Sequence, residues 1–303
     1  FLDQQGKPDT AKAAFMNGLK VYPFAKRNNP PANTFKNLTG SDVNTIHAND
    51  FKFYEELNDV IQREPSEVFS PELLGMASAI GIQKGKPFKP SKEQKALLTE
   101  AVAIGNATAR SILFAPQDPK AYIYPGKAGY WQTGFPGGNH DYVVNGGKGG
   151  RDMDGRTLFF YLATVHTPAM VLELPGVGSQ YAFSSRDSSG AYLDGSKTYK
   201  LNIPANPPAK RFWSFVVYDP QTRSMLQSKE MPYPSKNNKR NPEMAKNADG
   251  SIDLYFGPEA PAGKEANWVK TVPGKGWFGI FRLYGPGQEW FDRSWKLGAI
   301  EKI

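Results

Sequence analysis

From residue 179 onward the chain is a succession of short apolar runs separated by turn residues, and this pattern constrains the fold more than any other. The runs are rich in Val, Ile, Phe, Tyr and Trp, while Gly, Pro, Asn and Asp lie between them. Short strands joined by turns are typical of a β-sandwich or jelly roll. The expected strands are 180–184, 197–203, 212–218, 224–227, 252–256, 277–284 and 299–303.

The first third of the chain predicts helices instead. Segment 49–64 repeats apolar residues at helical spacing and stops before Pro65. Ser70 followed by Pro71 is a helix start signal, so we expect a helix over 70–81. Ser91 begins a capping-box pattern for a helix over 91–114. Its apolar stripe is expected to be Leu97, Ala101, Ile104, Thr108 and Ile112.

The composition changes near residue 115, which divides the chain into two expected domains. Residues 1–115 form a helical connecting region, and residues 116–303 form the β domain. Within the second part, a glycine-rich stretch precedes an apolar run at 154–170 that fits either a helix or a buried strand, and a helix is favoured. The expected class is therefore mainly β: an antiparallel jelly-roll or β-sandwich domain preceded by an α-helical region.

Two of the expected strands carry the most information. The strand 212–218 is apolar on both faces, which indicates a central strand covered on both sides. In the strand 277–284, Arg282 shares a face with apolar and aromatic residues. A buried arginine must be paired or reach water, because an unpaired buried charge is costly. Asp219, Asp249 and Asp253 are the candidate partners.

A polar corner follows the strand 212–218. Asp219 before Pro220 is the arrangement that a type I turn prefers, so the corner is expected to be structural. Arg223 is expected to restart a strand just after this turn. Asp249 lies in a second turn, the Asn-Ala-Asp-Gly sequence before the strand 252–256. Arg223 and Arg282 together mark where charge enters an otherwise apolar sheet.

Most standard catalytic and cofactor motifs are absent from the sequence. There is no cysteine, no phosphate-binding loop and no nucleophile-elbow motif, so we expect no cofactor. The three histidines, His47, His140 and His166, are far apart, and we expect no metal site. The net charge of +8 is spread along the chain, which does not favour nucleic-acid binding, and no run is apolar enough to cross a membrane.

Three classes of function stay open from the residues alone. The first is a binding or assembly protein with a small-molecule or carbohydrate ligand, and the second is a purely structural oligomer. The third is a hydrolase or lyase acting on a polysaccharide or lipid-derived substrate. In that enzyme, Asp219 or Asp249 would do acid–base work near Arg223 and Arg282. A homo-oligomer is expected.

Several long segments of the second half resemble a bacterial protein family. They are "GAYLDGSKTYKLNIP", "NPPAKRFWSFVVYDPQTRSMLQS", "NADGSIDLYFGPEAPAGKEANWVKTVPGKGWFGIFRLYGP" and "FDRSWKLGAIEKI". Proteins of this family pair two domains of unknown function, numbered 1254 and 1214, and these segments resemble the second domain.

This resemblance implies a jelly roll, export to the periplasm or secretion, and a first domain that is missing upstream. The chain begins at Phe1 rather than Met, which fits the removal of an upstream segment. The family has no established activity, so the resemblance supplies no catalytic residues. The expected ligand contacts, Trp213, Tyr218, Trp268 and Tyr284, match the family pattern.

Overall fold

Two four-stranded sheets form the β part of the molecule in the computed structural model, which describes residues 8–38, 46–163, 165 and 168–303. The first sheet is antiparallel and has the strand order β1 (Ser179–Ser184), β7 (Phe278–Pro286), β3 (Ala209–Tyr218) and β4 (Ser235–Asn237). The second has the order β6 (Trp268–Lys270), β5 (Ile252–Gly257), β2 (Tyr199–Ile203) and β8 (Ile300–Lys302).

One hydrophobic core fills the space between the two sheets. The first sheet contributes Phe215 and Phe281, and the second contributes Leu254 and Phe256, all with no exposed surface. The rings of Phe215 and Phe256 lie 4.9 Å apart, centroid to centroid, so the sheets are in direct contact. Burial of aromatic side chains on both inner faces is the main force that holds two stacked sheets together.

Seven α-helices accompany the eight strands in the described part of the chain, so the fold is mixed α/β rather than mainly β. They are α1 (Pro8–Gly18), α2 (Lys52–Arg63), α3 (Pro71–Ala79), α4 (Lys92–Phe114), α5 (Met153–Leu162), α6 (Pro168–Val171) and α7 (Gln288–Phe291). The strand orders do not confirm a jelly roll, and the β5–β6 pair is parallel where antiparallel pairing was expected.

The chain divides into two units, residues 1–45 and residues 46–303. The first contains α1 and a short 3₁₀ turn, Phe24–Lys26. The Asn33 side chain accepts a hydrogen bond from the Val21 N–H and donates one to the Leu19 carbonyl, which closes a loop. The sheets and all the other helices belong to the second unit, and the predicted boundary near residue 115 stays a prediction.

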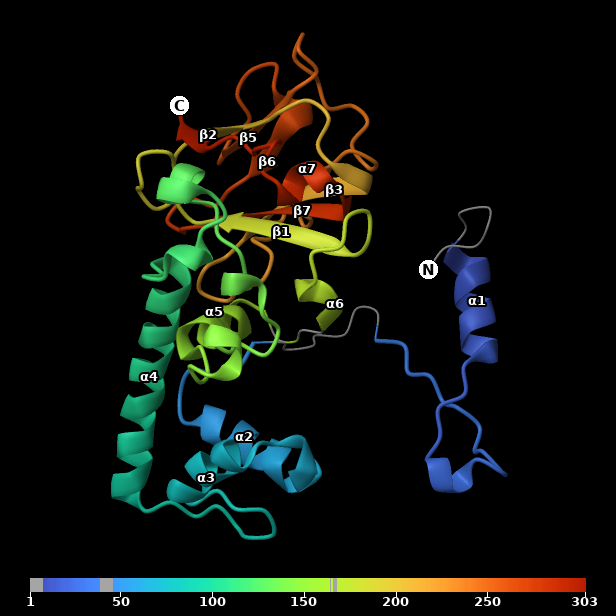
Figure 1. The fold of residues 1–303 in the computed structure, drawn as a ribbon, viewed down its shortest axis with the longest axis vertical. Coiled ribbons are helices and arrows are strands. Elements are labelled where there is room, and N and C mark those ends of the chain that lie inside the picture. Colours follow the sequence, from blue (N-terminus) through green and yellow to red (C-terminus); the bar gives the residue numbers. More distant parts are fainter. Residues whose placement is uncertain (1–7, 39–45, 164, 166–167) are drawn as a thin grey trace. The chain divides into compact units, whose positions relative to one another are not determined.

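Helix α4 joins two packing clusters of the second unit (Figure 1). Its N-terminal half packs with α2 and α3 through Leu98 and Val102. Its C-terminal half packs with α5 against the outer face of the first sheet, where the Phe114 and Phe278 rings meet edge to face at 5.7 Å. The helices therefore cover part of the outer face of the first sheet, and β3 is central in it, as its sequence predicted.

The local helix signals are confirmed, but the predicted stripe of α4 is wrong. Ser70 and Ser91 cap α3 and α4, and each side chain accepts the expected N–H. Leu97 and Ile104 of the predicted stripe are 67% and 59% exposed. The neighbouring stripe, which includes Leu98, is buried instead, because α2, α3 and the first sheet contact that side.

Two expectations in the β part also need correction. Segment 224–227 is not a strand; one isolated bridge, Tyr218 to Met225, is all that forms there. Strand β4 lies in the basic, Asn-rich segment 235–240, where no strand was expected. The run 154–170 is helical in two pieces, α5 and α6, as far as the structure describes it.

Candidate functional site

The outer face of the first sheet carries Arg282 in the middle of three strands. Arg282 lies opposite Tyr181 of β1 on one side and Ser214 of β3 on the other. Phe278 and Ile280 precede it on the same face of β7, where the helices cover them. The position that alternation assigned to Arg282 is therefore confirmed, and the side chain lies just beyond the helix-covered part of the face.

Arg282 has tyrosine neighbours rather than a carboxylate partner. Its Nη2 donates a hydrogen bond to the Tyr218 hydroxyl, and its Cζ is 5.8 Å from the Tyr181 ring centroid and 5.7 Å from that of Tyr218. Its Nε is buried and has no hydrogen-bond partner. Among the described residues no Asp or Glu forms an ion pair with Arg282, so none of the three expected partners is confirmed.

Arg223 approaches the same place from the corner after β3. It does not restart a strand: its φ of 57° is left-handed, which is uncommon for a residue other than glycine. Its guanidinium stacks on the Tyr161 ring at 4.0 Å and contacts Nε2 of His47 at 2.9 Å. All these partners are neutral or aromatic, and burial is the main cause that lowers the pKa of Arg223.

The two arginines line one cavity of about 230 Å³, which we call the arginine pocket. Its walls come from the segment 133–135, α5, α6, β1, β3 and β7. The lining residues are mostly apolar or aromatic and include no Asp or Glu: Thr133, Gly134, Phe135, Phe159, Leu162, Ala163, Met170, Gln180, Tyr181, Phe183, Tyr218, Arg223, Phe278, Ile280 and Arg282. The pocket thus combines an apolar body with two cations.

Tyr218 supplies a neutral hydroxyl to this pocket. Burial raises its pKa above the ordinary 10.0, and the nearby Arg282 cation opposes that shift. The phenol therefore keeps its proton at neutral pH. Tyr218 stacks on Phe278 with ring centroids 5.2 Å apart, which fixes the position of the hydroxyl beside Arg282.

A second cavity of about 530 Å³ adjoins the arginine pocket. The two share Thr133, Phe135, Gln180 and Tyr181 as lining residues, so they form one groove along β1. The second cavity adds the cations Lys120 and Arg293 and the anion Glu173. We call the two cavities together the β1 groove.

The Asp219 side chain does not line this groove, and both of its carboxylate oxygens already have partners. It is 6% exposed, and its Oδ1 accepts the Gln221 N–H at 2.7 Å. Its Oδ2 pairs with the Lys275 ammonium at 2.7 Å. The corner also closes differently from the expected type I turn, because the Arg223 N–H bonds to the Asp219 carbonyl four residues back. These contacts give Asp219 a structural part in the corner.

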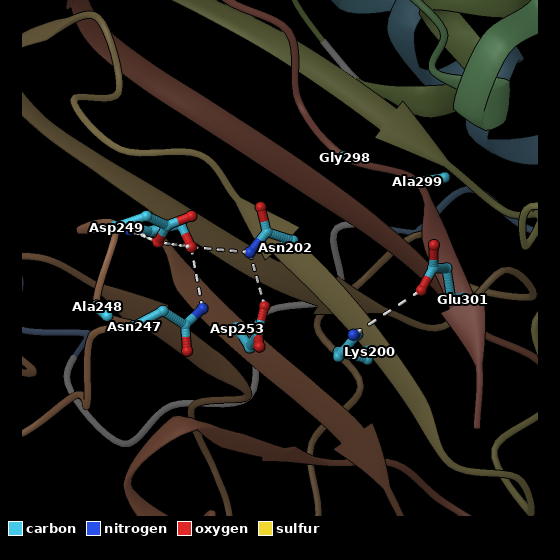
Figure 2. Close-up of a pocket in the computed structure, with 10 residues that line it drawn as sticks. Lys200, Asn202, Asn247, Ala248, Asp249, Asp253, Gly298, Ala299 and Glu301 are labelled. Carbon is cyan, nitrogen blue, oxygen red and sulfur yellow. Dashed lines mark hydrogen bonds and ion pairs between the residues drawn. The ribbon is translucent and has the colours of Figure 1, made fainter.

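Asp249 lies on the outer side of the second sheet, in an open polar pocket of about 510 Å³ (Figure 2). Its Oδ1 accepts hydrogen bonds from the backbone and the hydroxyl of Ser251, and these bonds lower its pKa. Asn202 links Ser251 to Asp253, with an Nδ2–Oδ1 distance of 2.7 Å to Asp253 (Figure 2). This network stabilises the turn before β5, and no arginine lines the pocket.

The expected aromatic contacts divide between core and surface. Trp213 is 2% exposed in the core between the sheets, which places it out of reach of a ligand in either pocket. Trp268 is half-buried and donates its Nε1 hydrogen to the Gly257 carbonyl. Tyr284 stacks on Phe212 at 4.1 Å on the outer face of the first sheet. Of the four expected residues, Tyr218 alone lines the arginine pocket.

The histidines do not converge in the part of the chain that the structure describes. His47 contacts Arg223, His140 lies 3.3 Å from Asp141, and His166 lies outside the described residues. The described residues include no cluster of three or more His, Asp or Glu side chains that could bind a metal ion. Across those same residues, no helix has the length and apolar character needed to span a bilayer.

Several pocket residues were not found from the sequence. Gln180 and Tyr181 lie on an expected strand, but nothing in one strand indicates which edge of a sheet it will form. Phe135, Phe159 and Met170 come from the glycine-rich stretch and the helical run. The one usable signal in the sequence is the arginine on an apolar face, since Arg282 lines the arginine pocket.

Comparison with known families matches part of the second half of the chain. Residues 178–288 match the family model described as "Protein of unknown function (DUF1214)". This confirms the resemblance to the second, 1214-type domain over those residues, and the 1254-type first domain is not shown. No curated protein matches the chain.

The solved structures that are similar to the chain include the following two. The VPA0106 protein from Vibrio parahaemolyticus is 20% identical with a TM-score of 0.41, over 91% of this chain and 59% of that one. A putative uncharacterized protein from Burkholderia cenocepacia is 16% identical with a TM-score of 0.33, over 77% of this chain and 48% of that one. The chain thus spans 48–59% of the length of these proteins.

Proposed function

We propose that this chain is a ligand-binding domain and that the arginine pocket binds a small organic anion with an apolar body. The observation that carries the proposal is the pair of guanidinium groups, Arg223 and Arg282, in an apolar cavity whose lining includes no carboxylate. An anion would supply the negative charge that the lining lacks and an acceptor for Arg282 Nε. Arg223 already bonds to the Tyr161 and Gln221 carbonyls and to His47, so it contributes charge rather than a free donor. The volume of about 230 Å³ is below the roughly 300–1,000 Å³ of drug-sized ligand sites.

Arg282 is the expected contact for the anionic group. Its Nε is a buried donor without an acceptor, and it belongs to a planar fork that matches a carboxylate. Leaving such a donor unsatisfied costs about 1–3 kcal/mol, which an anionic ligand would recover on binding. Tyr218 adds a hydroxyl next to the guanidinium.

The geometry supports ligand binding over a hydrolase or lyase reaction. Acid–base catalysis needs a titratable group within hydrogen-bond reach of the reacting atom. Asp219 is held by Lys275, and Asp249 lies on the other sheet, so neither lines the pocket that contains the arginines. The titratable groups that remain in the lining besides the arginines are the phenols of Tyr181 and Tyr218, and burial raises the pKa of Tyr218, which makes it a poor general base at neutral pH.

We also propose that the chain works outside the bacterial cytoplasm as a homo-oligomer built on a jelly-roll variant. The support is the resemblance read from the sequence, which implies export, together with the match of residues 178–288 to the model of the second domain. Fractionation of cells that express the native protein tests the location, and light scattering after gel filtration tests the oligomer. A cytoplasmic monomer would contradict this part of the proposal and leave the pocket assignment unaffected.

Isothermal titration calorimetry with 3-phenylpropionate tests the anion site. The uncharged 3-phenylpropionamide has nearly the same shape and is the matched ligand. We expect the acid to bind and the amide to bind at least tenfold more weakly, because hydrogen bonds to charged groups contribute about 1.5–3 kcal/mol.

Two variants complete the experiment. Arg282→Gln should lose the preference for the acid, while Arg240→Gln, which removes a cation from an exposed loop residue, should keep it. Equal affinity of the acid and the amide for the native chain would overturn the proposal. So would retention of the preference in Arg282→Gln.

A further inference from the structure

His47 touches the arginine pocket through one of its two arginines. Nε2 of the His47 ring lies 2.9 Å from Nη2 of Arg223, whose side chain lines the pocket. The contact joins the segment before α2 to the corner after β3, two parts of the chain that are far apart in sequence. The imidazole also packs against Tyr161 of α5 and Phe53 of α2, with ring centroids 5.9 and 6.3 Å away. Three elements therefore position this ring beside the guanidinium.

The contact between His47 and Arg223 fits only one charge state of the imidazole. A guanidinium has N–H donors and no acceptor, and it stays protonated in proteins. Nε2 of His47 must therefore accept the hydrogen bond, which requires a neutral ring with its proton on Nδ1. Nδ1 lies 3.2 Å from the Ala48 carbonyl, which can accept that proton in a hydrogen bond. Protonation of Nε2 would set a second donor and a second positive charge against Arg223, so the contact would break.

Nη2 is the part of Arg223 that this contact controls. Nε of Arg223 donates to the Tyr161 carbonyl at 3.1 Å, and Nη1 donates to the Gln221 carbonyl and the Tyr161 hydroxyl. Among the described residues, His47 is the one acceptor of Nη2. Loss of that acceptor therefore frees Nη2 to donate to a ligand in the pocket, while the other bonds keep the guanidinium in place.

The charged groups on the α2 side of His47 have partners of their own. Glu56 accepts the backbone N–H of the residue after His47 at 3.3 Å and pairs with Lys52 at 3.9 Å. Asp50 accepts the Lys52 N–H at 2.9 Å. Tyr54 is a phenol whose pKa is raised by burial, so it stays neutral. Across the described residues, no carboxylate forms an ion pair with His47.

The elements on the other side of His47 add one charged contact, Arg223 itself. Arg110 of α4 donates to a carbonyl of the corner after β3, and Asp219 of that corner pairs with Lys275 at 2.7 Å. Helix α5 contributes the ring and the hydroxyl of Tyr161. His47 is exposed, so once it is protonated its side chain can turn into water.

We propose that His47 is a positioning residue of the anion site and that its protonation releases Nη2 of Arg223 to the bound anion. This inference rests on the proposed function and names a regulation of the same site. While His47 is neutral, it occupies Nη2, and Arg223 contributes only its charge to the pocket. When His47 is protonated, the freed donor can bond to the anion. Proton binding and anion binding therefore strengthen each other by the same factor.

The coupling should be moderate, because His47 is exposed and a single hydrogen bond is exchanged. We expect 3-phenylpropionate to bind about three- to tenfold more tightly at about pH 5.5 than at about pH 7.5, the range in which histidine ordinarily titrates. The carboxyl group of this ligand resembles that of Glu, which ionises near about pH 4.3, so it stays charged over the range.

Calorimetry on the full chain at the two pH values tests the coupling. Gln at position 47 can present an acceptor oxygen to Nη2 but does not titrate, so His47→Gln should bind the acid equally at both pH values. Arg223→Gln removes the donor and should also abolish the pH dependence. His140→Gln is the matched control, because His140 lies in the glycine-rich loop beside Asp141 and does not line the pocket. This variant should keep the pH dependence of the native chain.

The tautomer of His47 gives a second readout that needs no ligand. Long-range nitrogen–proton spectra distinguish the two neutral tautomers, and the His47 signals are the ones that His47→Gln lacks. We expect the proton on Nδ1 at neutral pH, because Nε2 accepts from Arg223. A purely structural role of the ring in packing against Phe53 and Tyr161 would not require this tautomer.

Each outcome decides between this inference and the proposed function. Binding of the acid with equal affinity at both pH values, or more weakly at the lower one, overturns the coupling and leaves the anion site standing. So does a proton on Nε2 at neutral pH, or a pH dependence that persists in His47→Gln. Absence of binding at both pH values overturns the proposed function and this inference with it.

Discussion

Replacing Arg282 by Met tests whether this arginine serves the fold or a ligand. Met is unbranched and apolar, so it fills a similar path from β7 over the outer face of the sheet. The change removes the cation, the hydrogen bond to the Tyr218 hydroxyl and the buried Nε that has no partner. A structural arginine and a ligand-binding arginine predict different results.

The magnitude follows from two opposing terms. Loss of the charged hydrogen bond to Tyr218 costs about 1.5–3 kcal/mol, and removal of an unsatisfied buried donor returns about 1–3 kcal/mol. The two offset, so the free energy of unfolding of Arg282→Met should stay within about 1 kcal/mol of the native value. Binding of 3-phenylpropionate should nevertheless be lost.

Arg186→Met is the matched control. The guanidinium of Arg186 donates to the Gly190 carbonyl and the Tyr192 hydroxyl, both at 2.7 Å, and stacks on Tyr192 at 3.9 Å. No nitrogen of this side chain is buried without a partner among the described residues. Removal of this side chain has no compensating gain, so we expect the free energy of unfolding of Arg186→Met to fall by about 2 kcal/mol.

Urea unfolding followed by tryptophan fluorescence measures both variants. All six tryptophans lie in the unit that contains the two sheets, so the signal reports on its unfolding. The slope of the free energy of unfolding against urea concentration should not change, because the surface exposed on unfolding is the same. If the free energy of unfolding of Arg282→Met falls by more than about 3 kcal/mol, Arg282 serves to stabilise the fold, and its assignment as a ligand-binding residue is refuted.

Three further predictions concern the fold. Gly279→Ala places a methyl group on the Phe215 ring, so the free energy of unfolding should fall by about 1–3 kcal/mol, as measured in urea. Ser91→Ala removes the cap of α4 and should cost about 1 kcal/mol by the same measurement, whereas no loss would contradict the capping assignment. Burial raises the pKa of Tyr124 and Tyr218 above 10.0, so their stabilisation is complete below pH 10 and is lost as pH rises through the folded-state values. Absorbance at alkaline pH should show a class of tyrosines that ionises late, and uniform ionisation near pH 10 would contradict this.

Local signals in the sequence predicted the elements well. A Ser at the N-cap and a run of alternating aromatic residues act within a few residues, so α3, α4, β3 and β7 form where expected. Which side of α4 is buried could not be read locally, because both of its stripes are apolar. Contacts with α2, α3 and the first sheet decide this, and they involve residues far away in the sequence.

The candidate site was predicted in part for the same reason. Alternation placed Arg282 on an apolar face, but Arg223 reaches the same cavity through a left-handed corner that looked like the start of a strand. The cavity also needs β1 at the edge of the sheet and α6 across from it. Strand order depends on pairing over about a hundred residues, which no local pattern encodes.

The Nε–Hε resonance of Arg282 tests the central claim most directly. In a nitrogen–proton correlation spectrum, the signal is assigned as the one that Arg282→Gln lacks. Addition of 3-phenylpropionate should shift it downfield, because the buried Nε then donates to a carboxylate, while 3-phenylpropionamide should leave it in place. A signal that the acid does not move, although calorimetry shows that the acid binds, would contradict the assignment of this pocket as the anion site.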